Sequence, residues 1–105
     1  MEEPNIEYIL KLARGEESVR RRLVNVLQYE LPVEIEGYYT NIKSNQWQQA
    51  AFYVHKIKHK IGILGLEESY AMAEIYETQL AENRTDLQTD FEKTLPLMLN
   101  FVNSL

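Results

Sequence analysis

Two histidines and a lysine within five residues are the part of this sequence best suited to chemistry. Lys58 follows His55 by three positions and His59 follows it by four, so all three side chains share one surface if the segment is helical. Near neutral pH an imidazole can act as a nucleophile, because much of it is unprotonated. A lysine ammonium beside the ring would neutralise an anionic group carried on it. The segment is therefore a candidate site for chemistry on a histidine.

The residues around His55 predict that its side chain faces solvent. Apolar side chains recur at alternating intervals of three and four residues, which is typical of a helix buried along one face. These apolar positions are Trp47, Ala50, Val54, Ile57, Ile61 and Leu64. At about 100° per residue, His55 lies roughly 150° from the centre of that stripe. We expect a helix over about residues 45–64 that carries His55 on its exposed side.

The expected neighbours of His55 favour contact with another macromolecule. Ala51 and Gly62 have almost no side chain, so a partner could approach the ring closely. A glycine inside a helix costs about 1 kcal/mol relative to alanine, so Gly62 needs a reason such as close approach. Phe52 and Ile63 flank the histidine and offer apolar docking contacts. The predicted partner-binding residues are Ala51, Phe52, His59, Gly62 and Ile63.

Residues 55–66 resemble the phosphorylation motif of histidine phosphotransfer (HPt) domains. In that motif the phospho-accepting histidine is followed three residues later by lysine, then by small residues and a glycine that ends the helix. His55 and Lys58 match the opening, Gly62 matches a small position, and Gly65 matches the close. The helical pattern is compatible with the family over essentially the whole chain.

The resemblance implies a place in a two-component phosphorelay. A receiver domain carrying an aspartyl phosphate would dock over His55, whose imidazole would attack the phosphorus, and the group would then pass to a second receiver. Lys58 would pair with the phosphoryl oxygens, and Gly62 would leave room for the partner. The implied partners are response-regulator receiver domains or a hybrid histidine kinase. The receiver would hold Mg²⁺, so no cofactor is expected for this chain.

Other hypotheses follow from departures at His59, where the family usually has glycine, and at Lys60, where a small residue is common. The alternative is a helical adaptor, or pseudo-HPt domain, that binds receivers or a kinase without carrying phosphate. His55 and His59 also have the spacing of a helical metal pair, but two ligands are too few to predict a metal site. An enzyme is disfavoured because no second acid or base is placed beside His55. We interpret Lys56 and Lys60 as serving solubility and helix propensity.

The composition is that of one small acidic domain. The chain has 105 residues, of which 45% are hydrophobic and 26% charged, with a formal net charge of −5. The negative charge argues against nucleic acid as the main partner. The absence of cysteine excludes disulfides and is consistent with the cytoplasm. No apolar run approaches the roughly 20 residues that span a bilayer, and no signal peptide is apparent. We expect a cytoplasmic protein, and the resemblance implies a monomer.

The elements that must position the histidine are helices throughout. Pro32 and Pro96 lie inside two of them, and we expect a kink or short break at the first and a bend at the second. Four long amphipathic helices pack most simply as an antiparallel four-helix bundle, with a short first helix covering one end. The expected helices are a short one carrying residues 6–13, then 17–43, 45–64, 66–82, and a last one carrying residues 87–102. The whole chain, residues 1–105, forms one domain.

Overall fold

The computed structural model describes residues 2–105, and within that range every regular element is a helix. No strand occurs in the described part of the chain. The all-helical class and the order of helices predicted from the sequence are confirmed, with bounds that differ by a few residues. The five helices are α1 (Glu7–Ala13), α2 (Glu17–Lys43), α3 (Trp47–Ile63), α4 (Glu67–Ala81) and α5 (Gln88–Asn103).

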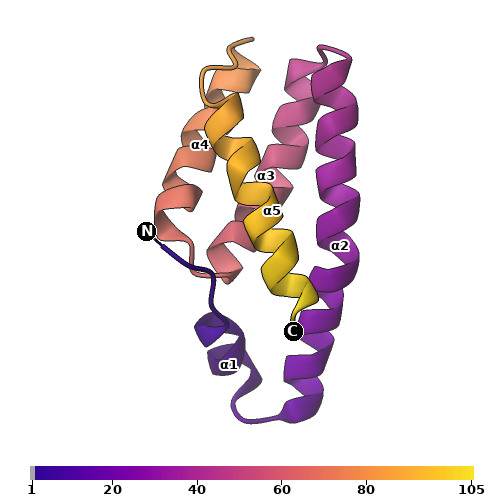
Figure 1. Ribbon diagram of the computed structural model, residues 1–105, viewed down its shortest axis with the longest axis vertical. Coiled ribbons are helices and arrows are strands. Elements are labelled where there is room, and N and C mark those ends of the chain that lie inside the picture. Colours follow the sequence, from indigo (N-terminus) through magenta and orange to yellow (C-terminus); the bar gives the residue numbers. More distant parts are fainter. Residues whose placement is uncertain (1) are drawn as a thin grey trace.

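The four long helices pack around a common core. Helix α3 contacts both α2 and α4, and α5 contacts the same two helices, so the contacts close a ring. Helix α1 packs beside the first turns of α2, at the lower end of the molecule in Figure 1. The molecule measures 44 × 25 × 19 Å along its principal axes. Among residues 2–105, no helix has both the length and the apolar character needed to cross a bilayer.

The apolar stripe of α3 lies in that core. Its positions at residues 50, 54, 57, 61 and 64 have no exposed surface, and Trp47 packs at the edge as a partly buried residue. The helix that carries His55 is therefore anchored by its opposite face, as the periodicity predicted. Burial of this much apolar surface fixes the rotation of α3 about its axis, and this rotation determines where the polar side chains point.

Two buried tyrosines, Tyr38 and Tyr76, link three of the helices. The hydroxyls of Tyr38 and Tyr76 lie 2.7 Å apart, and Tyr38 also donates a hydrogen bond of 2.9 Å to Glu92. Burial raises the pKa of both phenols, that of Tyr76 to about 12, because the charged phenolate would be poorly solvated there. These bonds join α2, α4 and α5.

Helix α2 continues through Pro32 without the break that the sequence led us to expect. Leu31 is fully buried and Ile35 is 7% exposed, so core packing on either side of the proline holds the helical backbone in place. Helix α5 likewise continues through Pro96. In both cases tertiary packing outweighs the loss of one backbone hydrogen-bond donor.

The first residues of the described chain tie down the start of α4. The Glu2 carboxylate accepts hydrogen bonds from the backbone N–H groups of Glu68 and Ser69, each 2.8 Å, and from the Ser69 hydroxyl at 2.6 Å. Burial would raise the pKa of Glu2, but these hydrogen bonds outweigh it and lower that pKa. The Asn5 N–H donates to the Leu64 carbonyl at 2.8 Å. A distant segment therefore caps the helix that faces α3.

Candidate functional site

His55 lies on the outer side of α3 with a carboxylate against one ring nitrogen. Its side chain is 49% exposed, and Nδ1 lies 3.1 and 3.2 Å from the two carboxylate oxygens of Glu77 on α4. When Nδ1–H donates to the carboxylate, Nε2 has no hydrogen and presents its lone pair. The ring is thereby oriented with a nucleophilic nitrogen away from Glu77.

Sequence reasoning did not identify Glu77. A signal was present, because His55 and Glu77 lie at similar separations along the chain on either side of Gly65. If the helices before and after that glycine form a hairpin, residues equally far from the turn lie opposite one another. The glycine has a positive φ of 77°, and a Cβ added there would come within 2.5 Å of the Asn5 side chain, so the turn requires glycine.

Lys58 occupies a different position from the one expected beside the ring. Its side chain is only 9% exposed, and Nζ lies 3.1 Å from Glu77 Oε1 and 3.9 Å from Glu74 Oε2. The Tyr70 ring covers the ammonium, with its centroid 5.7 Å away. Lys58 therefore reaches His55 through Glu77, on the Nδ1 side of the imidazole. The lysine holds the carboxylate that orients the histidine.

His59 contacts the other nitrogen of His55. The two Nε2 atoms are 3.2 Å apart, and the rings meet edge to face with centroids separated by 4.7 Å and planes at 81°. Both residues are exposed. The nitrogen that would act as nucleophile therefore has a second imidazole as its neighbour.

The remaining predicted partner-binding residues divide into exposed and buried groups. Phe52 is 56% exposed and lies under the Lys56 ammonium, Gly62 is exposed, and Ile63 is half-buried. Ala51, in contrast, is 8% exposed and belongs to the core, so it is not a surface contact. The physical reason is that α3 packs against α2 on one side and α4 on the other. Its buried arc is therefore wider than the apolar stripe alone indicates.

Gly62 has a packing role within the chain. A Cβ added at this position would lie 3.3 Å from Cδ2 of Tyr70, which is tighter than ordinary contact. The glycine therefore lets the Tyr70 ring of α4 lie close against α3. The same residue also lines a shallow surface groove together with His59 and Ile63, so a partner could still approach it there.

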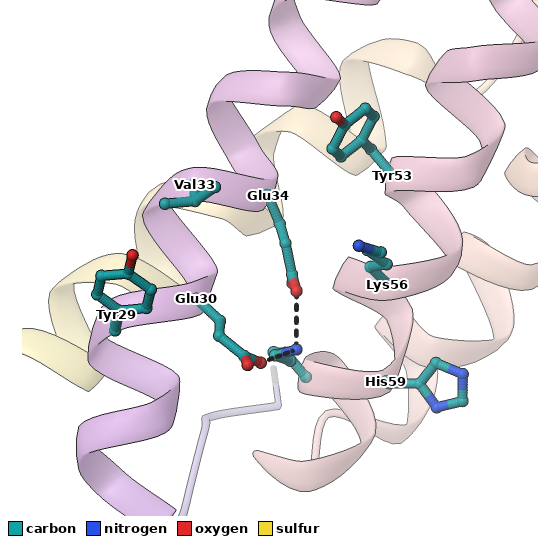
Figure 2. A pocket seen from close by; sticks show the side chains of 8 residues that line it. Tyr29, Glu30, Val33, Glu34, Tyr53, Lys56 and His59 are labelled. Carbon is teal, nitrogen blue, oxygen red and sulfur yellow. Dashed lines mark hydrogen bonds and ion pairs between the residues drawn. The ribbon is translucent and has the colours of Figure 1, made fainter.

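A second groove lies on the α2 side of α3, with His59 at one edge (Figure 2). The groove has a volume of about 460 Å³. Its lining residues are Tyr29, Glu30, Val33, Glu34, Tyr53, Lys56, His59 and Lys60.

Lys60 lies in this groove and is held by two carboxylates of α2. Its ammonium is 2.8 Å from Glu30 and 2.9 Å from Glu34, and the side chain is 12% exposed. Burial lowers the pKa of Lys60, but the hydrogen bonds to the two glutamates outweigh that effect and raise it. Our interpretation of Lys60 as a solubility residue was wrong, because the residue belongs to an ion-pair cluster between two helices.

The described residues contain no group of three or more histidine, cysteine or acidic side chains placed to hold a metal ion. Comparison of the chain with protein-family models, with curated proteins and with solved structures finds no match.

Proposed function

We propose that this chain is a histidine phosphotransfer protein of a two-component phosphorelay. It accepts a phosphoryl group from a receiver-domain aspartate on His55 and passes it to another receiver. The observation that carries the proposal is the half-exposed imidazole whose Nδ1 is bound by Glu77, which leaves Nε2 as the nucleophile. The chain is a relay intermediate and does not turn over a substrate of its own.

In the transfer, Nε2 of the imidazole makes the new bond and the groups at Nδ1 stabilise the resulting charge. The Nε2 lone pair of His55 attacks the phosphorus of the aspartyl phosphate; the N–P bond forms while the P–O bond to the aspartate breaks. The electron pair of the broken bond leaves with the carboxylate. The ring becomes positively charged, and the Glu77 carboxylate at Nδ1 stabilises that charge. Lys58 keeps Glu77 in place through its 3.1 Å contact. Mg²⁺ belongs to the receiver.

The fold and the exposed residues are compatible with this role. On the proposal, α2 to α5 form the antiparallel four-helix bundle of the HPt family and α1 is the extra N-terminal helix. The closed ring of helix contacts supports that arrangement. Phe52, Gly62 and Ile63 lie along α3 near the histidine and would contact the receiver or the hybrid histidine kinase. We propose that the chain works as a cytoplasmic monomer, with neither nucleic acid nor membrane as a partner.

Phosphoryl transfer from a receiver domain tests the proposal directly. Purified receivers are loaded with radiolabelled acetyl phosphate, freed of the donor and mixed with the chain. We expect label on the chain that is lost in acid and stable in base, as for a phosphohistidine, and that is absent from His55→Gln. Lys56→Gln, which changes an exposed residue next to His55 in sequence, is the matched control and takes up label normally. Label that persists in His55→Gln would refute the proposed acceptor.

A second candidate function, the non-phosphorylated adaptor, is favoured by one contact. His59 lies 3.2 Å from the nitrogen that must attack, so it could keep His55 from reacting. An adaptor would bind receivers in a pull-down or by calorimetry, yet would take no label from any of them. Binding unchanged by His55→Gln, together with no transfer, would establish the adaptor in place of the relay.

A further inference from the structure

His59 contacts Nε2 of His55, the nitrogen that would react. A histidine at position 59 is not part of the HPt motif. Because Nδ1–H of His55 donates to Glu77, Nε2 of His55 can only accept a hydrogen bond. The 3.2 Å contact between the two Nε2 atoms then requires that His59 donate through its own Nε2–H. The two rings meet edge to face, with planes at 81°.

The neighbouring cations are engaged elsewhere. Lys58 is paired with Glu77 on the far side of the ring, and Lys60 is paired with glutamates of α2. The Lys56 ammonium lies over the Phe52 ring, 4.7 Å from its centroid. Within the described residues, the hydrogen-bond donor found at Nε2 of His55 is the His59 imidazole.

We propose that His59 binds the phosphoryl group in this protein: its Nε2–H donates to Nε2 of His55 in the free chain and to a phosphoryl oxygen after transfer. The inference deepens the proposed function and rests on it. Formation of the N–P bond uses the lone pair that His59 contacts, so the donor loses its acceptor. The phosphoryl group then puts three anionic oxygens in the same place, and a short movement of the ring restores a charge-assisted hydrogen bond.

The proposed contact affects the lifetime of the phosphohistidine and, in the free chain, the tautomers of both histidines. A phosphoryl group bound to nitrogen carries about two negative charges, whereas a loose, metaphosphate-like transition state for its loss carries about one. A charge-assisted hydrogen bond to its oxygens therefore stabilises the phosphorylated protein more than that transition state. One hydrogen bond of ordinary strength corresponds to roughly a two- to tenfold longer lifetime of the phosphohistidine. In the free chain, His55 carries its proton on Nδ1 and His59 on Nε2 once both rings are neutral.

The experiment uses inorganic phosphoramidate as a small phosphoryl donor, so that no partner protein is needed. The chain is loaded, the modified residue is located by fragmentation mass spectrometry, and decay is followed by ³¹P NMR in EDTA. We expect phospho-His55 to decay roughly two- to tenfold faster in His59→Ala than in the unaltered chain. His59→Gln, which keeps an N–H donor, restores most of the lifetime. Lys56→Ala is the matched control and leaves it unchanged.

Side-chain ¹⁵N NMR of the free chain supplies a readout that a purely structural role would not move. Nε2–H on His59 and an unprotonated Nε2 on His55 are expected, and the His55 Nε2 signal shifts in His59→Ala. An unchanged lifetime in His59→Ala, or the Nδ1–H form of His59, overturns the proposal. So does equal loading of His59 in His55→Gln, which would make the two rings interchangeable. An effect of His59 that disappears in EDTA would also overturn it, by showing a metal chelate.

The two proposals fail in different ways. If receivers transfer no label to His55, the relay is refuted, although the phosphoramidate arm still reports on the His59 contact. If receivers do transfer label and the lifetime is independent of His59, only the role of His59 is refuted.

Discussion

Helix α3 takes part in two ion-pair clusters of similar composition that differ in what else they contact. The α4-side cluster consists of Lys58, Glu74 and Glu77, and the α2-side cluster consists of Lys60, Glu30 and Glu34. Each holds a largely buried ammonium between two carboxylates from a neighbouring helix. Only the α4-side cluster contacts an imidazole, because Glu77 is shared between Lys58 and His55.

A buried lysine is by itself weak evidence of function. In the α2-side cluster both Lys60 and Glu34 are about nine-tenths buried, and one Glu34 oxygen has no hydrogen-bond partner. Such a pair joins two helices and costs stability when half of it is removed. In the α4-side cluster Glu77 is 27% exposed, and its carboxylate also contacts Nδ1 of His55. We therefore expect the α2-side cluster to matter for stability and the α4-side cluster for phosphotransfer.

The largest expected effect is on stability, from Lys60→Met. Removing the ammonium leaves the buried Glu34 carboxylate unpaired, and we expect a loss of about 3 kcal/mol in the free energy of unfolding. Urea denaturation followed by circular dichroism measures it. Adding Glu34→Leu to Lys60→Met should recover much of the loss, because no buried charge remains unpaired. A loss below about 1 kcal/mol would show that the pair behaves like a surface ion pair.

Changes in the α4-side cluster should slow phosphotransfer. Glu77→Gln removes the charge at Nδ1 and allows the amide to donate to that nitrogen, which favours the wrong tautomer of His55. We expect at least about a tenfold slower uptake of label from a phosphorylated receiver. Glu34→Gln makes the same chemical change in the α2-side cluster and should leave the rate unaltered. Equal rates for Glu77→Gln and the unaltered chain would remove the distinction between the two clusters.

Alkaline pH should weaken the α2-side cluster. The folded-state pKa of Lys60 is raised above the ordinary value, so its contribution is fully present below about pH 10 and is lost as the pH rises through the folded-state pKa. The buried phenol of Tyr76, with its pKa raised to about 12, loses its contribution in the same direction. Unfolding free energies measured across this range should fall less steeply for Lys60→Met. Identical slopes would contradict a raised pKa at Lys60.

The smallest effect is expected for Gly62→Ala, one turn after Lys58. Better helix propensity gains up to about 1 kcal/mol, and the tight contact with Tyr70 offsets part of it. Thermal unfolding should therefore show a net change below about 1 kcal/mol. A large destabilisation would mean that Tyr70 cannot yield, and that this contact fixes the distance between α3 and α4.

The sequence predicted the helices well because one physical rule, burial of a periodic apolar face, decides them. The fully buried stripe of α3 and the exposure of His55 follow from that rule. The helix ends were less predictable. The histidine helix was expected to begin at about residue 45, but Gln46 is its N-cap residue and no side-chain capping bond forms there. Turn geometry takes precedence at that point, since Asn45 adopts a positive φ of 57°.

The partners of charged side chains could not be read from one helix at a time. The burial of Lys58 and Ala51 depends on the second neighbour of α3, which a helical wheel does not contain. The Glu77 contact depends on the register between α3 and α4. The sequence supplies the turn at Gly65 but not that register. The apolar stripe places His55, whereas the groups that orient its ring depend on tertiary packing.

The hydrogen bonds that Glu2 makes to the start of α4 have a practical consequence for the laboratory. Helix α4 carries both this anchored first turn and Glu77, whose carboxylate contacts His55. A purification tag or fluorophore fused ahead of Glu2 would compete with that docking and disturb the helix. Attachment after Leu105, which is exposed, leaves the anchor intact. A recombinant protein that lacks Glu2 would lose these hydrogen bonds to the start of α4.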